Sequence, residues 1–262
     1  MSVRSARKES SQCSVVILAA GQGKRMRSQL PKVLHPLAGK PMIMHVLRQV
    51  AQAVPGANVA IIVGHGRELV EAAIRADAVN QALKIEFVVQ PAQNGTGDAA
   101  KCALDSVWGK ARVTEKANIL ILPGDLPLIA QELIRAMALP LGRNEAVRLL
   151  TCELPNPMGY GRVVRRSSKG PVLRIVEERD SNEREKLIRE VAASIYLFQS
   201  GFLRFGLDRI RNKNAQGEYY LTDLIELAAK SRKKIDILKW MDPNDLRGIN
   251  DRWELSEARR FM

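Results

Sequence analysis

Cysteine, aromatic residues and long hydrophobic runs are scarce in this sequence, and each scarcity excludes a class of protein. The three cysteines, Cys13, Cys102 and Cys152, are far apart, odd in number and without a C-x-x-C pair, which argues for reduced thiols rather than a disulfide framework. No apolar run is long enough to cross a membrane, and the first dozen residues lack the hydrophobic core of a signal peptide. We therefore expect a cytoplasmic protein that has no membrane partner.

Aromatic residues make up only 5% of the chain, although its net charge is +13. Such a charge can serve nucleic-acid binding or attract small anionic substrates. The basic residues are dispersed, as in Arg165-Arg166 and Arg259-Arg260, and no cluster of aromatic residues offers a stacking platform for bases. The composition therefore argues against a nucleic-acid partner.

Two common phosphate-binding motifs are also absent from residues 15–27, VVILAAGQGKRMR. A dinucleotide fingerprint would need its third glycine at Met26, and a Walker A loop would need glycine at Leu18 and Ser or Thr at Arg25. The stretch instead combines a buried-strand run, a turn of small residues and three cations. Exposed N–H groups beside cations suit a polyphosphate, so we expect a phosphate-binding loop of a different kind.

Hydrophobic periodicity divides the chain into two regions. Up to about residue 140, predicted strands alternate with helices, which favours a parallel sheet; these strands are 15–18, 58–63, 84–89 and 118–122, with one helix from Met42 and another running through Trp108. Short strands separated by Pro/Gly turns are then predicted at 147–154, 162–166 and 172–178, and a further strand at 192–198 after a charged helix or loop. A helix at 220–229, a strand at 235–238 and a final helix from about 251 follow. The denser β region should form a second, smaller lobe over the ligand cleft.

Polar residues suited to ligand binding follow the predicted strands. Lys32 lies in a segment bounded by two prolines, which favours an extended backbone. Gln90 carries an amide, which both donates and accepts and can therefore read a nucleobase edge, while Thr96 is placed to cap the next helix. Asp125, at the end of a strand, suits Mg²⁺ or, equally, a helix cap.

An ordered series of short motifs resembles the sugar-phosphate nucleotidylyltransferases. The series comprises 18–26 (LAAGQGKRM), 31–32 (PK), 64–66 (GHG), Gln90, 95–97 (GTG), 124–125 (GD), 159–162 (GYGR), 175–177 (IVE), 214–223 (NAQGEYYLTD) and 248–250 (GIN). Within that family the chain is most similar to the uridylyltransferase domain of the bacterial bifunctional N-acetylglucosamine-1-phosphate uridylyltransferase/glucosamine-1-phosphate acetyltransferases. The resemblance runs from about Ser14 to the C-terminus.

This resemblance implies a fold and an activity. The fold is α/β, a Rossmann-like (glycosyltransferase A-like) mixed sheet flanked by helices with a smaller β-rich sugar-binding lobe. Residues 1–13 would be a flexible basic tail, and 14–262 a nucleotidyltransferase domain ending in a helical segment. The activity is condensation of UTP with N-acetylglucosamine 1-phosphate to UDP-sugar and pyrophosphate, with Mg²⁺ as cofactor. It proceeds by in-line attack on the α-phosphorus, for which positioning and charge neutralisation suffice.

The resemblance also assigns roles to individual residues. Catalysis falls to Arg25, Lys32 and Asp125; nucleotide binding to Leu18, Ala19, Ala20, Gly21, Gln90, Gly95, Thr96, Pro123 and Gly124; sugar binding to Gly161, Glu177 and Asn250; and Mg²⁺ binding to Asp125 and Asn250. Pro123 stands where the family often has an aromatic residue.

Two departures from the family leave alternatives open. Ala192 stands where the family has an asparagine that contacts the N-acetylated sugar, and alanine cannot make that hydrogen bond. The chain also ends where the family's left-handed β-helix would begin, so we expect uridylyl transfer alone, in a monomer or weak homo-oligomer. A different sugar or base, or a non-catalytic nucleotide-sugar-binding protein, remains as an alternative.

Overall fold

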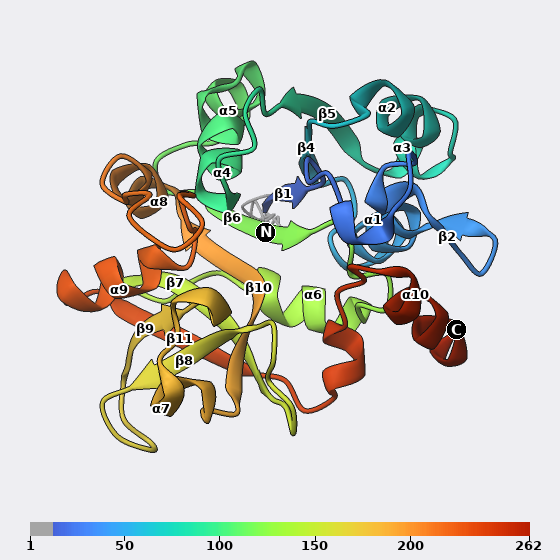
Figure 1. Ribbon diagram of the computed structural model, residues 1–262. Coiled ribbons are helices and arrows are strands. Elements are labelled where there is room, and N and C mark those ends of the chain that lie inside the picture. Colours follow the sequence, from blue (N-terminus) through green and yellow to red (C-terminus); the bar gives the residue numbers. More distant parts are fainter. Residues whose placement is uncertain (1–12) are drawn as a thin grey trace, which may run out of the picture.

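The four strands predicted in the first half of the chain are present in the computed structural model and run parallel (Figure 1). They are β1 (Ser14–Leu18), β4 (Asn58–Val63), β5 (Lys84–Val89) and β6 (Asn118–Pro123), in the spatial order β6-β1-β4-β5. All but β5 are buried almost throughout, which explains their continuous apolar runs. The structure describes residues 13–262, the side chain of Asn80 excepted, so the expected tail lies outside it but for Cys13.

The strands of the second region extend this same sheet. β7 (Glu145–Glu153), β10 (Glu190–Gln199) and β11 (Lys234–Lys239) complete the order β11-β7-β10-β6-β1-β4-β5. β10 is antiparallel to both β6 and β7, which makes the sheet mixed. The hairpin of β8 (Gly161–Arg165) and β9 (Val172–Val176) branches from β10 as the smaller β-rich part. The α/β fold class predicted from the sequence is therefore confirmed.

Helices cover both faces of the sheet because side chains alternate along each strand. Val15 and Ile17 of β1 face one core, whereas Val16 faces the other. The first core is covered by α1 (Met42–Ala53), α2 (Arg67–Arg75) and α6 (Gln131–Ala138), and the second by α4 (Thr96–Asp105), α5 (Val107–Arg112), α8 (Ser200–Leu207) and α9 (Asp223–Lys230). The other short elements are α3 (Val79–Ala82), α7 (Glu183–Lys186), α10 (Arg252–Ala258), the hairpin β2 (Pro36–Leu37) and β3 (Lys40–Pro41), and the 3₁₀ helices η1 (Lys24–Met26), η2 (Lys32–Leu34), η3 (Glu178–Asp180), η4 (Pro243–Leu246) and η5 (Arg259–Phe261).

Two local predictions were wrong. The helix expected to run through Trp108 ends before Ser106, whose hydroxyl accepts from the Gly109 N–H at 3.2 Å and so starts α5 afresh. The segment around Lys32 is not extended but forms η2, because the backbone angles of Pro31 suit the residue before a tight turn. The Leu34 N–H donates to the Pro31 carbonyl at 2.9 Å and closes that turn.

A third, smaller core joins the two ends of the chain. Met26, Leu37 and Met42 from the N-terminal region are buried together with Ile249 and with two residues of α10. In Figure 1 the dark red α10 accordingly lies beside the blue α1. The C-terminal segment therefore packs directly against the loop that follows β1.

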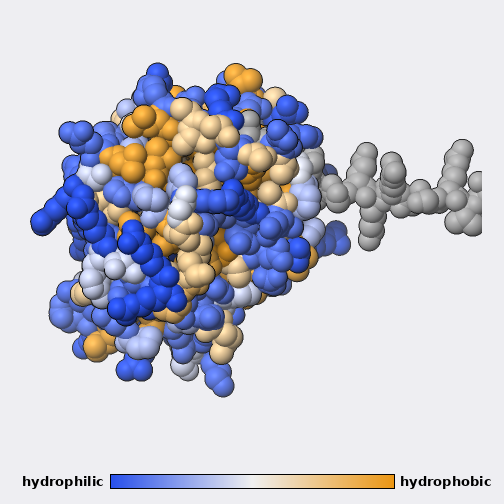
Figure 2. Space-filling view, turned by 90° about the vertical axis from the view of Figure 1, so that its right-hand side faces the viewer, coloured by the Kyte–Doolittle hydropathy of each residue, from blue (hydrophilic) through white to orange (hydrophobic). Residues whose placement is uncertain are grey.

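The surface carries no continuous apolar band on the face that Figure 2 shows, where hydrophilic residues predominate and hydrophobic residues lie in patches among them. Across residues 13–262, none of the helices combines the length and apolar character needed to cross a bilayer.

Candidate active site

The candidate site lies where the carboxyl ends of the parallel strands meet. The chain leaves β1 toward β4 on one side and later returns to β6 on the other, and open α/β sheets bind ligands at such a switch point. The Gly124 N–H donates to the Leu18 carbonyl and the Ala19 N–H to the Ile62 carbonyl, both at 2.9 Å. These two bonds hold the start of the loop between the strands on either side of it.

The loop after β1 leaves a row of backbone N–H groups free. Those of residues 20–23 donate no hydrogen bond to any residue within the described range 13–262. The loop is nevertheless anchored, because Gln93 Nε2 donates to the Ala20 carbonyl at 2.9 Å. A Cβ added at Gly21 would meet nothing within 4 Å, so this part of the loop borders open space. Free N–H groups in a loop that borders open space suit phosphate oxygens.

Two exposed cations follow the free N–H groups directly. Lys24 and Arg25 lie in η1, and the side chain of neither forms an ion pair or hydrogen bond with another described residue. Both are therefore available to a polyanion. Arg25, which the sequence predicts to be catalytic, thus lies at the site, although no contact of its guanidinium tests that role.

Lys32, Asp125 and Asn250 come together beneath this loop from distant parts of the sequence. Lys32 Nζ donates to Asp125 Oδ2 and, at 3.2 Å, to Asn250 Oδ1. The side chains of Lys32 and Asp125 are only 17% and 15% exposed, so their ion pair is shielded from water. The Ile249 N–H donates to the Asp125 carbonyl at 3.0 Å and brings Asn250 into place. Gly23 is required above the lysine, since an added Cβ would lie 2.6 Å from Lys32 Cβ.

The donor set around Lys32 fits a hard divalent cation. Asp125 and Asn250 offer one carboxylate and one amide oxygen, the ligand type that Mg²⁺ prefers, and both reach the same positively charged nitrogen. Within the described part of the chain, no group of three or more His, Cys, Asp or Glu side chains could enclose a metal ion. A cation here would therefore keep water or substrate phosphate oxygens as its other ligands.

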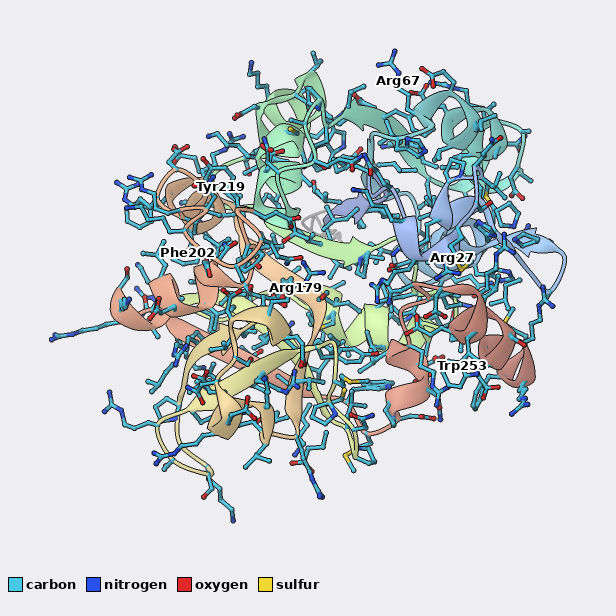
Figure 3. All side chains as sticks on the ribbon, in the orientation of Figure 1. Arg27, Arg67, Arg179, Phe202, Tyr219 and Trp253 are labelled. Carbon is cyan, nitrogen blue, oxygen red and sulfur yellow. The ribbon has the colours of Figure 1, made fainter. Side chains whose placement is uncertain are left out.

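The C-terminal segment also forms hydrogen bonds with the loop that follows β1. Arg252 donates through Nε to the Met26 carbonyl at 3.0 Å and through Nη2 to the Arg27 carbonyl at 3.1 Å. Figure 3 shows Arg27 and Trp253, neighbours of these contacts, on the same side of the molecule. Sequence reasoning missed Arg252, since nothing in its local pattern distinguishes it from a solvated helix residue.

Gln90 and Gly95 lie together on the far side of the loop. Gln90 is 5% exposed, and its Nε2 donates to the Gly95 carbonyl at 3.1 Å and to Asp98 Oδ2 at 2.7 Å. Gly95 has a positive φ of 104°, and a Cβ there would lie 2.6 Å from the Tyr219 carbonyl oxygen, so only glycine fits. Sequence reasoning also missed Asp98, which reads as an ordinary acidic residue in the first turn of a helix.

Thr96 has a different local role from the one predicted. It is the first residue of α4 rather than its cap, and its hydroxyl accepts from the Leu221 N–H at 3.0 Å. Tyr219, labelled in Figure 3, adds two backbone bonds: its N–H donates to the Asn94 carbonyl at 2.7 Å and its carbonyl accepts from Gly97 at 2.8 Å. The predicted helix-capping role of Thr96 was therefore wrong, because Thr96 instead binds residues 219–221 to this turn. Contact between Thr96 and a base stays a prediction.

The predicted sugar-binding residues Gly161 and Glu177 lie beside each other. A Cβ added at Gly161 would stand 3.4 Å from Glu177 Oε2, and Thr222 Oγ1 donates to Glu177 Oε1 at 2.8 Å. Burial raises the pKa of the Glu177 carboxyl above its usual range, and the Thr222 hydroxyl opposes this only in part. Ala192 is the strand partner of Gly161 and is 3% exposed. Asn250 has no hydrogen bond to either predicted sugar residue, so its contact with sugar stays a prediction.

Comparisons with known proteins identify relatives of this chain. The profile of the MobA-like NTP transferase domain matches residues 15–190. The bifunctional protein GlmU of Xanthomonas oryzae pv. oryzae is 42% identical over 94% of this chain and 51% of its own length. The GlmU proteins of Syntrophomonas wolfei and Desulfotalea psychrophila are each 41% identical, over 95% and 96% of this chain and 53% and 70% of their own lengths. The chain thus spans about half the length of the first two relatives.

A solved structure shares the fold. A putative glucose-1-phosphate thymidylyltransferase from Bacillus anthracis, crystallised with sucrose, superposes with a TM-score of 0.71 at 18% sequence identity. The superposition covers 95% of this chain and 94% of the other. At that identity the likeness concerns the fold alone.

Proposed function

Because the chain belongs to the MobA-like NTP transferase family and is a sugar-phosphate nucleotidyltransferase domain similar to that of GlmU, we propose that it makes a UDP-sugar from UTP. The acceptor is N-acetylglucosamine 1-phosphate or a close relative, and the second product is pyrophosphate. One observation carries the proposal: Lys32, Asp125 and Asn250 converge beneath a loop whose N–H groups at residues 20–23 have no partner in the described chain. The free thiols of the three cysteines are consistent with a cytoplasmic location.

The reaction joins two phosphates and needs no covalent intermediate on the protein. A phosphate oxygen of the sugar 1-phosphate forms a bond to the α-phosphorus of UTP, and the bond from that phosphorus to the β-phosphate oxygen breaks as pyrophosphate leaves. The N–H groups of residues 20–23 bind the triphosphate oxygens, and Arg25 and Lys32 neutralise their charge. These groups lower the barrier mainly by orientation and electrostatics.

The remaining predicted residues hold the cation, the base and the sugar. Asp125 and Asn250 would hold Mg²⁺, which neutralises phosphate charge and orients the phosphate oxygens when bound. Gln90 reads the base, and the Glu177 carboxylate accepts from a sugar hydroxyl. The Lys32 ammonium, paired with Asp125 in this structure, turns to the phosphates when substrate binds.

Pyrophosphate release in the presence of UTP, Mg²⁺ and a panel of sugar 1-phosphates tests the proposal. We expect release with at least one sugar, and inactivity with every sugar would count against an enzyme. UTP binding without turnover would instead indicate a nucleotide-sugar-binding protein. Asp125→Asn should abolish turnover while leaving the melting temperature close to that of the wild type. Asp208→Asn, which alters an exposed ion pair with Lys101, serves as the matched control.

A neighbouring sugar is the second candidate, and Ala192 favours it. Its methyl group beside Gly161 offers no hydrogen bond to a 2-acetamido substituent, and it is too buried for solvent to take over that role. The same panel separates the candidates, because a plain hexose 1-phosphate would then outcompete N-acetylglucosamine 1-phosphate. Preference for the N-acetylated sugar would contradict this second candidate and support the first.

A further inference from the structure

The amide of Gln90 has a fixed orientation. Its Nε2 lies 2.7 Å from Asp98 Oδ2 and 3.1 Å from the Gly95 carbonyl oxygen, and both oxygens can only accept. Turning the amide over would set its own oxygen against both of them. The nitrogen end must therefore face Asp98, and the oxygen end must face the other way.

The opposite end of this amide is free. Gln90 Oε1 accepts no hydrogen bond from any residue of the described chain, and it is not among the atoms sealed from solvent without a partner. Gln90 itself directly follows β5, with its N–H held by the Val63 carbonyl at 2.8 Å. The same turn contacts the phosphate loop through Gln93 and Ala20. The free oxygen thus belongs to the turn beside the loop that we propose binds nucleotide.

An amide oxygen held in this direction can only accept a hydrogen bond, so it recognises a donor of the base such as an N–H group. Uracil carries a hydrogen on N3, whereas N3 of cytosine is a bare acceptor that would repel the amide oxygen. Thymine carries the same N3–H as uracil, so the oxygen does not separate these two bases. The fixed orientation of the Gln90 amide therefore discriminates uracil from cytosine, but not uracil from thymine.

We propose that Asp98 is a positioning residue that sets this choice: by accepting from Gln90 Nε2, it holds Oε1 toward N3–H of uracil and disfavours cytosine nucleotides. The inference rests on the proposed use of UTP. Asp98 is well suited to the role, because an ionised acceptor forms a shorter and stronger bond than the Gly95 carbonyl does.

Replacement of Asp98 by asparagine tests whether Asp98 fixes the orientation of the Gln90 amide, because the side chain hardly changes in size. The new amide can either accept from Gln90 or donate to it, so only the Gly95 carbonyl still favours one orientation, and Gln90 can also turn over and present its NH₂ to the base. We measure dissociation constants for UTP, CTP and dTTP by calorimetry with Mg²⁺ and without sugar. The wild type should prefer UTP to CTP, and Asp98→Asn should reduce that preference roughly tenfold, the factor that corresponds to one hydrogen bond to a charged group. The ratio of UTP to dTTP should stay the same.

Two further variants separate positioning from a general structural effect. Asp105→Asn removes a carboxylate from the end of the same helix, where it pairs with Lys101 at 3.8 Å, and should leave the ratio of UTP to CTP unchanged. In a Gln90→Ala background, Asp98→Asn should have no further effect on that ratio, because Asp98 acts through Gln90.

Each other outcome overturns the inference. These outcomes are an unchanged ratio in Asp98→Asn, an equal loss in Asp105→Asn, a further loss in the Gln90→Ala background, and a wild type that does not distinguish UTP from CTP. Binding is measured without transfer, so the two proposals can fail separately. Selective UTP binding without any sugar product would overturn the proposed reaction alone.

Discussion

Replacing Arg252 with methionine should loosen the phosphate loop and weaken the binding of UTP. The change removes the hydrogen bonds from Nε to the Met26 carbonyl and from Nη2 to the Arg27 carbonyl, at 3.0 and 3.1 Å. Methionine keeps much of the side chain's apolar length, so packing along the stem is retained. Arg252 lies outside the proposed binding groups and would act through the loop that carries Arg25.

The size of the effect follows from these two bonds. Arg252 is an exposed residue, so each bond contributes a net of about 1 kcal/mol, and both together about 2 kcal/mol. That free energy corresponds to a factor of about 30 in the population of the ordered loop, and hence at most about 30-fold in the apparent affinity for UTP. Met26 is only 1% exposed and keeps part of the loop packed, so the loss of apparent affinity should stay below this limit. Arg252→Lys, which can reach one carbonyl, should lose about fivefold.

The assay is steady-state kinetics with UTP as the varied substrate, together with hydrogen exchange of the loop amides. We expect KM for UTP to rise more than kcat falls, and exchange to quicken at the hydrogen-bonded loop amides of Met26 and Arg27. Arg259→Met, another exposed arginine of the C-terminal segment, is the matched control and should change neither. An unchanged KM in Arg252→Met, or an equal rise in Arg259→Met, would refute the reasoning.

Three further predictions follow from single contacts. Burial and neighbouring carboxylates raise the pKa of Asp223 from 3.8 to about 6, so the folded state holds this proton more tightly than the unfolded state does, and the stabilisation that the proton gives is lost as pH rises from about 4 to 6. The gain in melting temperature of Asp223→Asn over the wild type should therefore be larger at pH 7 than at pH 4. A gain that is the same at both pH values would contradict this. Gly66→Ala should raise KM for UTP and lower stability by about 1 kcal/mol or more, because φ is 63° and the new Cβ would lie 2.5 Å from Pro31 Cγ, next to Lys32; unaltered kinetics would show that the turn adapts. Ile61→Ala should lower the unfolding free energy in urea by about 3 kcal/mol, since the side chain is fully buried, yet leave kcat per folded molecule unchanged.

Much of the first half of the fold could be predicted from the sequence, because its signals are local. The run Val15–Leu18 reads as a buried strand in any context, and the α1 stripe repeats at the helical period. Glycines at 21 and 23, followed by cations, predict a phosphate-binding loop from a local pattern of the same kind. Errors arose where two local rules compete, as at Pro31, which excludes an ordinary helix but suits the start of a 3₁₀ turn.

The candidate site could be predicted only as a set of separate residues. Lys32 and Asn250 are 218 positions apart, and no local pattern indicates that their side chains meet. The direction of the Gln90 amide is likewise invisible in the sequence, because it depends on a carboxylate in the first turn of α4.

The sequence by itself thus determined the strands and most helices, since these depend on neighbours within a few residues. Only the tertiary structure decided that β7, β10 and β11 join the main sheet and that the C-terminal segment returns to the phosphate loop. The physical reason is that strand order and the packing of α10 on Met26 depend on long-range burial. The convergence of Lys32, Asp125 and Asn250 is a consequence of that burial.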